Sequence, residues 1–547
     1  MRWLHARLKL GLPFWEKKER LRDFMNKYSF RRQMEPASRL KYLWLVLGTI
    51  CSLFSFNGRW DIALAAWLAP FFLLRFMRTS RTRIGLTGVW LATALAMLFS
   101  FYSLQLLTPL LIVVGLLFST VLTLPYLLDR LVAPRLSLVS GLLATLLFPL
   151  SRVAGEYLIS FTPAVGSVFS LAYTQYGNVP LLQIISVTGV YGVSFLIAWF
   201  ASVGNWIWEQ HFAWPRIRAV TLLYSGLLAL VLLGGSLRLA FFPPSAQTVR
   251  VAGINAASST LQRVRQEIST LSTNQPFTPA DLVQLRSAFV PLDNELLNLS
   301  RREARAGAKI IVWPEIGAYI LATDKTSLLE RGQTLAREAR VYLDMGMAVF
   351  QPPATYYNQA VLVDPQGHVD WTYNKAYPAP GDLSKPGNAV VPFVETPYGL
   401  LANVICFDAD FTDLMRQAGS QGVDIMLVPS NDWQEIDPWH TQHAIFRAIE
   451  NGYSLVRPTS NGLAMTVDYQ GNVLAATDYF TTQQTMIASV PVKGTWTIYA
   501  HVGDLFAWLC SAGMLFLAGF VAFTAFQRRR RASEPLSEQS SLNSESE

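Results

Sequence analysis

Long apolar runs alternate with short basic segments over the first half of the chain. Seven of these runs have the length that a helix needs to cross about 30 Å of hydrocarbon, roughly 17 to 25 residues, and an eighth lies near the C-terminus. Their approximate bounds are residues 41–57, 60–77, 84–103, 105–128, 135–154, 180–208, 219–242 and 503–526. The pattern predicts a polytopic α-helical membrane domain of about 8 transmembrane helices.

Between the seventh and eighth runs the pattern changes to short apolar strands that alternate with amphipathic helices. Strands are expected at 249–255, 309–312 and 345–351, and helices with apolar residues spaced at three and four are expected at 282–306 and 327–341. Short, mostly apolar strands with interleaved helices are typical of a sheet covered by helices. Residues 243–502 are therefore predicted to form an α/β sandwich outside the membrane.

Basic residues are distributed unevenly among the segments that flank these runs. The first 41 residues hold twelve Lys and Arg against four acids, and alternate loops after them are also basic. Of the loops between the basic ones, the first carries only Arg59, the second carries no charge, and the third has Arg152 near its edge. Because Lys and Arg gather on the cytoplasmic side, the N-terminus is predicted to be cytoplasmic and the α/β domain extracytoplasmic. If one marginal run, the first or the fifth, were re-entrant, the domain would lie on the other side.

The composition agrees with this division of the chain. With 51% hydrophobic and 15% charged residues and a mean hydropathy of +0.28, the 547 residues exclude a wholly soluble protein. The net charge of +8 is explained by topology and anionic lipid, without nucleic acid. The predicted parts are a basic cytoplasmic segment (1–40), transmembrane helices 1–7 (41–242), the α/β domain (243–502), transmembrane helix 8 (503–527) and a disordered cytoplasmic tail (528–547).

Only one of the three cysteines lies in the α/β domain. Cys51 and Cys510 fall inside apolar runs, where a cysteine serves as a small packing residue. Cys406 stands at the end of an apolar strand at 400–405 and has no partner in its own domain for a disulfide. It is either a buried core residue or a reactive thiol.

A carboxylate and an ammonium stand at two other predicted strand ends. Glu315 follows the buried strand that Pro314 terminates, and Lys375 follows a strand at 369–373. A thiol attacks a carbonyl as the thiolate, so it needs a base or a nearby cation. Glu315 could take the proton, and Lys375 could lower the pKa of the thiol and then stabilise an oxyanion, assisted by the backbone N–H after Cys406. Each residue alone is weak evidence, but the three together indicate a nucleophilic site.

These motifs resemble those of the nitrilase, or carbon-nitrogen hydrolase, superfamily. The segments 312–315 (VWPE), 373–375 (YNK) and 405–411 (ICFDADF) are similar to those around its Glu-Lys-Cys triad. The resemblance narrows to the membrane-embedded branch, the apolipoprotein N-acyltransferases, when further segments are included. These are 156–157, 173–176, 180–183, 189–195, 430–433, 460–462 and 497–499, together with Arg447, Glu450, Gly452, Gly503 and Asp504.

The resemblance implies a fold, a reaction and a location. The fold would be a nitrilase-like αββα sandwich held outside the bacterial cytoplasmic membrane, with Glu315, Lys375 and Cys406 as catalytic residues. Cys406 would take a fatty acyl chain from a membrane phospholipid as a thioester and pass it to the N-terminal diacylglyceryl-cysteine of a lipoprotein. No cofactor is implied. The thioester is reactive toward amines, and tethering the site at the bilayer brings it close to a lipid donor.

The chain departs from the family pattern at two acids. Asp382 is the candidate for the supporting acid after the lysine, and Asp408 stands where the family prefers glutamate. The aromatic residues Phe407, Phe411 and Trp433 either line an acyl or lid surface or belong to an ordinary core. Two other functions remain open: a membrane-tethered amidase or hydrolase with water as acceptor, and a non-enzymatic scaffold. An intact triad disfavours the scaffold.

Metal and nucleotide sites are not expected. The six histidines show no metal-ligand spacing, and the pair His440 and His443 is interpreted as a feature of a helix surface or a lid. No glycine-rich phosphate loop is present in the sequence.

Overall fold

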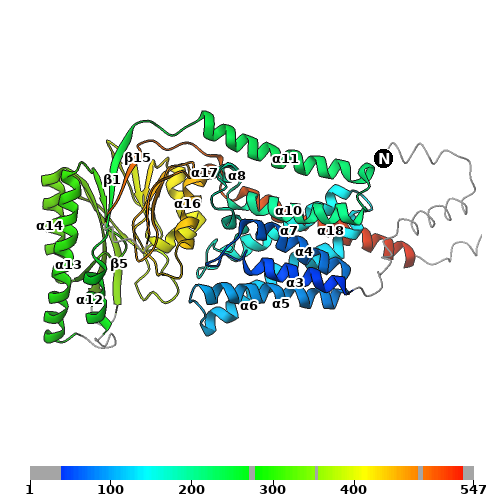
Figure 1. The fold of residues 1–547 in the computed structure, drawn as a ribbon, viewed down its shortest axis with the longest axis horizontal. Coiled ribbons are helices and arrows are strands. Elements are labelled where there is room, and N and C mark those ends of the chain that lie inside the picture. Colours follow the sequence, from blue (N-terminus) through cyan, green and yellow to red (C-terminus); the bar gives the residue numbers. More distant parts are fainter. Residues whose placement is uncertain (1–38, 270–276, 352–354, 479–484, 534–547) are drawn as a thin grey trace, which may run out of the picture.

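The molecule divides into a bundle of apolar helices and an α/β domain at one end of it. A computed structural model describes residues 39–269, 277–351, 355–478 and 485–533. Figure 1 shows the long helices side by side, with the sheets of the α/β domain stacked beyond their ends. The predicted basic segment 1–40 lies outside the described residues except for residues 39 and 40. Of the predicted disordered tail 528–547, residues 528–533 are helical, which corrects the prediction there, and residues 534–547 lie outside the described residues.

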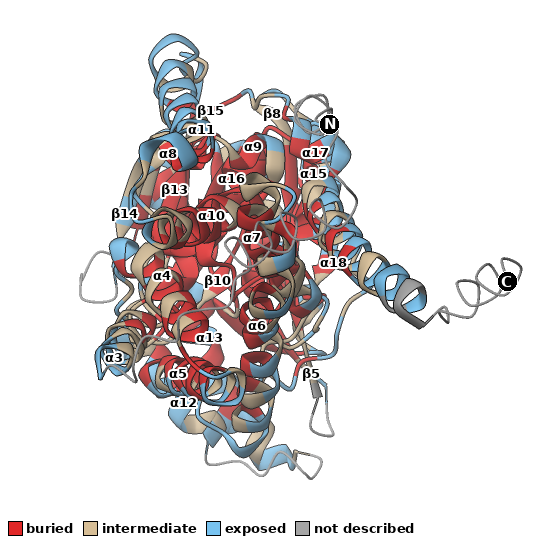
Figure 2. Cartoon of the chain, turned by 90° about the vertical axis from the view of Figure 1, so that its right-hand side faces the viewer, coloured by how far each residue is buried: buried red, intermediate tan, exposed pale blue. Residues whose placement is uncertain are grey.

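Eight long helices occupy the positions of the predicted apolar runs. They are α3 (Leu40–Leu53), α4 (Ala63–Thr79), α5 (Thr82–Ser103), α6 (Pro109–Leu136), α7 (Gly141–Ser160), α10 (Val190–Glu209), α11 (Trp214–Phe241) and α18 (Leu505–Ser533). Six of them, all but α3 and α4, are long and apolar enough to cross a membrane by length and composition. Helices α7 and α10 lie inside the bundle, whereas α11 and α18 have exposed outer faces (Figure 2).

One predicted helix is broken in the structure. The sequence predicts a single helix over 180–208, but the chain forms α8 (Val179–Leu182), α9 (Ile185–Thr188) and α10. Gly189 has a φ of 63°, a left-handed conformation that glycine adopts readily and that ends α9. The Glu450 side chain, from the α/β domain, accepts the Val190 N–H at 2.8 Å. This buried contact satisfies a free N–H at the start of α10.

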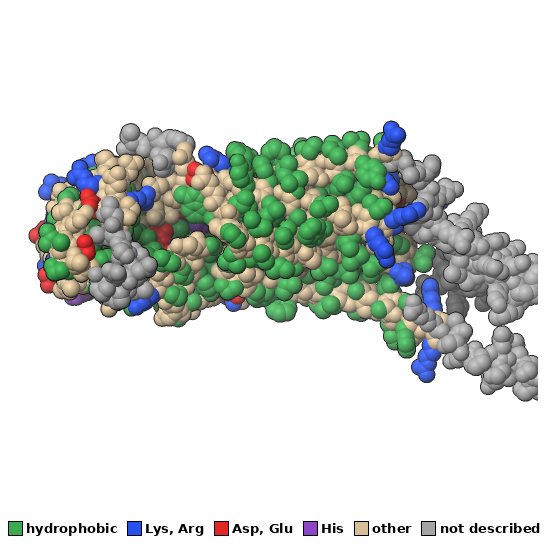
Figure 3. Space-filling model, turned by 90° about the horizontal axis from the view of Figure 1, so that it is seen from below, with side chains coloured by type: hydrophobic (Ala, Val, Ile, Leu, Met, Phe, Trp, Pro, Cys, Tyr) green, Lys and Arg blue, Asp and Glu red, His purple; other side chains and the backbone are tan. Residues whose placement is uncertain are grey.

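The loops of the bundle gather at two opposite ends. At the end away from the α/β domain, Arg78 donates to Glu209 at 3.4 Å and Arg130 donates to the Ser80 carbonyl at 3.0 Å, so the C-terminal parts of α4, α6 and α10 meet there. Exposed basic residues at this end are Arg81, Arg83, Arg135, Arg216 and Arg218. Figure 3 shows Lys and Arg at this end, while the sides of the bundle are mainly apolar.

The α/β domain contains two sheets that stack face to face. The first has the order β15-β1-β2-β4-β5-β6 with β3 paired to β4, the second has the order β14-β13-β11-β9-β8-β7, and a two-stranded sheet joins β10 and β12. The strands are β1 (Thr248–Ile254), β2 (Ile310–Val312), β3 (Ala318–Leu321), β4 (Tyr342–Gln351), β5 (Thr355–Val363), β6 (Val369–Asn374), β7 (Phe393–Thr396), β8 (Gly399–Asn403), β9 (Ile425–Leu427), β10 (Ser430–Asn431), β11 (Ser454–Arg457), β12 (Thr459–Ser460), β13 (Ala464–Val467), β14 (Val473–Thr477) and β15 (Thr485–Pro491).

Helices cover both outer faces of the stacked sheets. Helices α12 (Ser258–Ser269), α13 (Pro279–Arg305) and α14 (Lys325–Ala339) lie on the side away from the bundle, whereas α16 (Trp439–Asn451) and α17 (Ile498–Val502) lie toward it (Figure 1). Helix α15 (Thr412–Ser420) packs against α16 and α17. The predicted α/β sandwich is confirmed as a general architecture.

Buried polar contacts join the bundle to the α/β domain. The Ser167 N–H and hydroxyl both donate to the Asp410 carbonyl, at 3.0 and 2.8 Å. Trp433 donates its indole N–H to the Leu104 carbonyl at 2.9 Å. These contacts come from the loops after α5 and α7, so the loops at this end of the bundle form part of the surroundings of Cys406.

Candidate active site

Cys406 stands at a sharp turn after β8, at the start of the short 3-10 helix Cys406–Asp410. Its N–H donates to the Pro429 carbonyl at 3.0 Å, and its φ of 51° is left-handed. A non-glycine residue adopts such a φ only at a cost, and strained positions of this kind cluster at functional sites. The thiol is nearly buried, with 4% of the residue exposed.

Glu315 and Lys375 form a buried ion pair. Lys375 Nζ lies 2.7 Å from Glu315 Oε1 and 3.2 Å from Asp382 Oδ2, and Asn358 also donates to Glu315 Oε1 at 2.7 Å. Both members of the pair are 3% exposed. The structure thus brings two predicted site residues into direct contact and places Asp382 beside them.

The first sheet positions this pair because neighbouring strands end near one another. Glu315 follows β2 after two residues, and Lys375 directly follows β6, where its N–H donates to the Asn358 carbonyl of β5 at 2.9 Å. Gly346 of β4 lies against the segment before Glu315. A Cβ at this position would lie 2.0 Å from the Pro314 carbonyl oxygen, so only glycine allows this approach.

The electrostatics of Cys406 differ from the simple expectation that Lys375 lowers the pKa of its thiol. Burial, Glu315 and Asp432 raise the pKa of Cys406, and Lys375 only partly opposes them. Burial also disfavours the charge of Lys375, but Glu315 and Cys406 outweigh it and hold the lysine pKa well above its ordinary value. The resting site therefore contains a protonated thiol beside an ammonium and needs a base.

The two supporting acids have different surroundings. Asp408 accepts hydrogen bonds from the Tyr373 hydroxyl at 2.8 Å and from the N–H groups of Tyr377 and Ile405 at 2.8 and 3.0 Å. Burial raises the pKa of Asp408 to about 6, although Lys375 and these donors oppose the rise. Asp408 therefore ties the Cys406 turn to the segment after Lys375, and it is not among the residues that line the cavity.

Asp382 faces the site from the loop after Lys375. Its carboxylate accepts from the Tyr356 hydroxyl at 2.6 Å and from the Ser384 N–H at 2.8 Å. Burial raises the pKa of Asp382, but Lys375 and these donors outweigh it, and the net shift is downward. An ionised Asp382 is thus held against the Lys375 ammonium.

A cavity of about 270 Å³ opens beside the thiol at the junction of the two parts of the molecule. From the α/β domain it is lined by Glu315, Ile316, Tyr356, Lys375, Ala379, Pro380, Asp382, Cys406, Phe407, Asn431, Asp432, Trp433, Ile436, Trp439 and His440. From the helical part it is lined by Asn57, Ser100, Phe101, Leu104, Leu106, Leu111, Ala164, Val165, Val168 and Phe169. The wall from the helical part is mostly apolar.

Two of the three predicted aromatic residues line this cavity. Phe407 and Trp433 are lining residues, whereas Phe411 stacks on Tyr377 with ring centroids 3.7 Å apart. Phe411 is therefore a packing residue, and Phe407 contacts it edge-on at 5.3 Å. The sequence alone did not separate these two roles.

The interpretation of His440 and His443 as a surface or lid feature is wrong, because both residues are buried at 4% and 3% exposure. His440 Nδ1 lies 2.7 Å from Asp432 Oδ1, and its Nε2 lies 2.8 Å from Asp410 Oδ2. His443 stacks on Tyr173 with centroids 3.8 Å apart. Nearly every residue of α16 is buried, since the helix packs against the strands on one side and the bundle on the other. The scarcity of charged residues in its sequence was the available signal.

The same histidine belongs to a group with the spacing of a metal site. Ligand atoms of Cys406, Asp432 and His440 lie within 4.8 Å of one another. Both ring nitrogens of His440, however, already face carboxylates. The prediction that no metal is bound stays a prediction.

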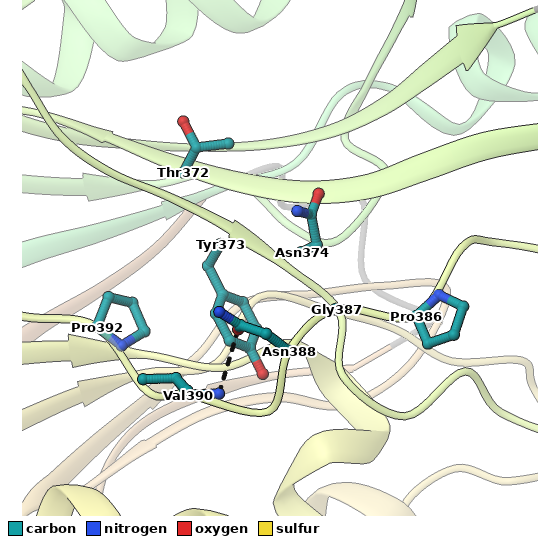
Figure 4. A pocket seen from close by; sticks show the side chains of 8 residues that line it. All are labelled: Thr372, Tyr373, Asn374, Pro386, Gly387, Asn388, Val390 and Pro392. Atoms are coloured by element: carbon teal, nitrogen blue, oxygen red, sulfur yellow. Dashed lines mark hydrogen bonds between the residues drawn. The ribbon is translucent and has the colours of Figure 1, made fainter.

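A second, larger hollow of about 600 Å³ lies beside the edge strand β6 and has no part in this constellation. Figure 4 shows its lining residues, which are Thr372, Tyr373 and Asn374 at the end of β6 and Pro386, Gly387, Asn388, Val390 and Pro392 from the segment before β7. Asn388 accepts the Val390 N–H at 3.3 Å. None of Glu315, Lys375 and Cys406 lines it. The cavity beside Cys406 is therefore the candidate active site.

Two family models match separate segments of this chain. The family model of the carbon-nitrogen hydrolases matches residues 280–497, and that of the apolipoprotein N-acyltransferase N-terminal domain matches residues 48–203. The chain is therefore a membrane-associated enzyme of the carbon-nitrogen hydrolase superfamily. Within that class, it belongs to the apolipoprotein N-acyltransferase family.

Individual relatives cover most of the chain. The apolipoprotein N-acyltransferase of Geobacter metallireducens is 28% identical over 71% of this chain and 75% of its own, and that of Haemophilus influenzae is 25% identical over 64% and 69%. Among solved structures, an amidase from Nesterenkonia sp. is 17% identical, with a TM-score of 0.34, over 46% of this chain and 94% of that chain.

Proposed function

We propose that this chain transfers a fatty acyl chain from a membrane phospholipid to the N-terminal diacylglyceryl-cysteine of a lipoprotein, through a thioester on Cys406. The observation that carries the proposal is the cavity with two unlike walls. Glu315, Lys375 and Cys406 line one side, and apolar residues of the helical part line the other. A hydrolase of small polar amides needs no such second wall, whereas an acyl chain is accommodated by one.

The first half-reaction is an acyl transfer from oxygen to sulfur. Glu315 takes the proton of the Cys406 thiol, and the thiolate attacks the ester carbonyl of the phospholipid. Lys375 Nζ and the backbone N–H of Phe407 stabilise the tetrahedral oxyanion. The carbon–oxygen bond then breaks, Glu315 returns the proton to the departing alkoxide, and the lysophospholipid leaves.

The second half-reaction transfers the acyl chain from sulfur to nitrogen. The neutral α-amino group of the lipoprotein attacks the thioester carbonyl, and Glu315 takes a proton from the attacking nitrogen. The carbon–sulfur bond breaks, and the proton returns to the Cys406 thiolate. Asp382 supports both steps by holding Lys375 in place, and Phe407 and Trp433 contact the bound acyl chain.

The proposed topology is eight crossings with the α/β domain outside the cytoplasm. It is supported by the exposed basic residues at the far end of the bundle, because such residues favour the cytoplasmic side. Helices α3 and α4 have 14 and 17 residues, so they would cross with the flanking segments completing the span. The location is then the bacterial cytoplasmic membrane.

The proposal is tested with the full-length protein in phospholipid vesicles that carry a labelled palmitoyl chain. Wild type is expected to become labelled, and Cys406→Ala to remain unlabelled while still in the membrane. Labelling of the Cys406→Ala protein would contradict the thioester. Adding a diacylated lipopeptide should give a product with a third acyl chain by mass spectrometry. Release of free fatty acid without that product would favour the hydrolase.

A further inference from the structure

A second group of buried charges lies against the Cys406 turn, apart from Lys375 and Glu315. The Cys406 thiol donates a weak hydrogen bond to Asp432 Oδ1 at 3.8 Å. The same oxygen lies 2.7 Å from His440 Nδ1, and Arg457 NH2 lies 3.3 Å from Asp432 Oδ2. Arg457 NH1 also donates to the Cys406 carbonyl at 3.4 Å. The thiol is therefore held by a carboxylate that two cations fix in place.

His440 is held at both ring nitrogens by acids from separate elements. Asp432 comes from the loop after β10 and Asp410 from the 3-10 helix that begins at Cys406. Both carboxylates are buried, with 3% and 2% of their side chains exposed. Burial and Arg457, whose NH2 lies 2.9 Å from His440 Nδ1, disfavour a charged His440, but Asp432 and Asp410 outweigh them, so its pKa is raised well above the usual value. The two carboxylates therefore favour the imidazolium form of His440.

The charged groups that face the thiol have opposing effects. Burial raises the pKa of the Cys406 thiol, as do Glu315 and Asp432, whereas Lys375 and His440 lower it. Arg457 is coupled to the thiol as a further cation. Asp410 does not touch the sulfur but fixes the far side of His440. Asp432 and His440 therefore act on the same sulfur with opposite signs.

We propose that Asp432 and His440 form a positioning pair that orients the resting Cys406 thiol and offsets the charge of the carboxylate beside it. Asp432 accepts the S–H and so fixes the direction of the sulfur toward the cavity. The imidazolium of His440, clamped by Asp410, keeps Asp432 from repelling the thiolate that forms in each half-reaction. The proposal rests on Cys406 being the nucleophile of the proposed function.

The pair also couples the nucleophile to the helical part of the molecule. Asp410 presents its carboxylate to His440 and its backbone carbonyl to Ser167, which donates to it from both its N–H and its hydroxyl. Gly166 lies so close that a Cβ would stand 2.6 Å from this carbonyl oxygen. Asp410 therefore links the loop after α7 to His440 through its carbonyl and its carboxylate.

The test is the pH dependence of alkylation of Cys406 by iodoacetamide in the full-length protein in detergent. Cys51 and Cys510 are replaced by alanine in every variant, so that alkylation is measured at Cys406 alone. H440Q removes a cation while retaining an amide of similar size, and the alkylation midpoint is expected to rise by about one pH unit, a tenfold lower rate at neutral pH. D432N removes a carboxylate, and the midpoint is expected to fall by about as much.

The opposite shifts separate a positioning pair from a structural role. D432N should be alkylated faster than wild type at pH 7 but acylated more slowly by phospholipid, because the sulfur has lost its orientation. H443Q is the matched control: His443 lies on the same helix, contacts Tyr173 instead of Asp432, and should leave the midpoint unchanged. If H440Q does not reach the membrane, D432N carries the test alone.

Shifts of the same sign in H440Q and D432N, or an unchanged midpoint in D432N, would overturn the pair. The alkylation assay contains neither phospholipid nor lipopeptide. If wild type adds no third acyl chain to the lipopeptide, but H440Q and D432N still shift the alkylation midpoint in opposite directions, the proposed function is contradicted and the positioning pair is still supported.

Discussion

Replacing Lys375 by methionine should destabilise the α/β domain at neutral pH and stop formation of the acyl-enzyme. The Nζ atom lies 2.7 Å from Glu315 and 3.2 Å from Asp382, and it is buried with them. Removing one partner of a buried pair costs about 3–5 kcal/mol, because the remaining charge stays without compensation. For a domain of about 250 residues, this corresponds to a fall in Tm of roughly 6–20 °C.

The dependence of this loss on pH follows from the acids that remain. In wild type the pKa of Asp382 is lowered, so its stabilising contribution is present above the usual aspartate pKa and is lost only as the pH falls through the lowered value. Between pH 7 and 5 wild type should therefore change little through this group. In K375M the Asp382 carboxylate lacks its cation and protonates more readily, so the Tm of the variant should recover toward wild type as the pH falls.

A double-mutant cycle in detergent tests the reasoning. E315Q with K375M removes both charges of the pair, so the double variant should be more stable than K375M alone at pH 7. The exposed Lys385, whose Nζ lies 4.9 Å from the Tyr357 ring centroid, provides the control K385M, which should leave the Tm within about 1 °C. Additive losses of E315Q and K375M, to within about 0.5 kcal/mol, would refute the buried-pair argument.

Two further variants test the geometry of the cavity. Gly346→Ala should lower the rate of acyl-enzyme formation in vesicles at least tenfold, because its Cβ would displace the Pro314 carbonyl that precedes Glu315. The control Gly226→Ala, at a position with open space around it, should leave this rate unchanged. Equal rates for the two variants would contradict the argument. Leu111→Trp should slow acylation of Cys406 by long-chain phospholipids more than by short-chain ones, because Leu111 lines the cavity. The control Leu110→Trp should show no such difference, because Leu110 is 71% exposed. Equal slowing of Leu111→Trp with both chain lengths would place the acyl chain elsewhere.

The strand ends that carry the triad could be predicted because each is marked locally. An apolar run before Pro314 and a second run before Cys406 define buried strands, and the polar residue after each run is at the strand end. The structure places β2 and β8 within those runs. The order of strands in the two sheets could not be predicted, because it depends on pairings such as β1 with β15, more than 200 residues apart in sequence.

The residues that contact the Cys406 thiol could not be predicted from the sequence for a related reason. His440 lies 30 residues from Asp410 and 8 from Asp432, and nothing in its local pattern distinguishes a buried imidazolium from a surface histidine. The break before α10 was missed in the same way, since the Glu450 carboxylate that accepts the Val190 N–H comes from 260 residues away. Both features are fixed by tertiary contacts.

The arrangement of the cavity divides the reaction between the two parts of the molecule. In the proposed mechanism the α/β domain supplies the groups that make and break bonds, because the candidate catalytic residues Glu315, Lys375 and Cys406 all follow its strands. Among the described residues that line the cavity from the helical part, none is ionisable, and Phe101 of α5, Leu111 of α6 and the loop residues Leu104 and Phe169 provide apolar contacts. Changes at these residues of the helical part should therefore alter which acyl chains are accepted. Changes at the strand ends should alter whether the acyl group is transferred at all.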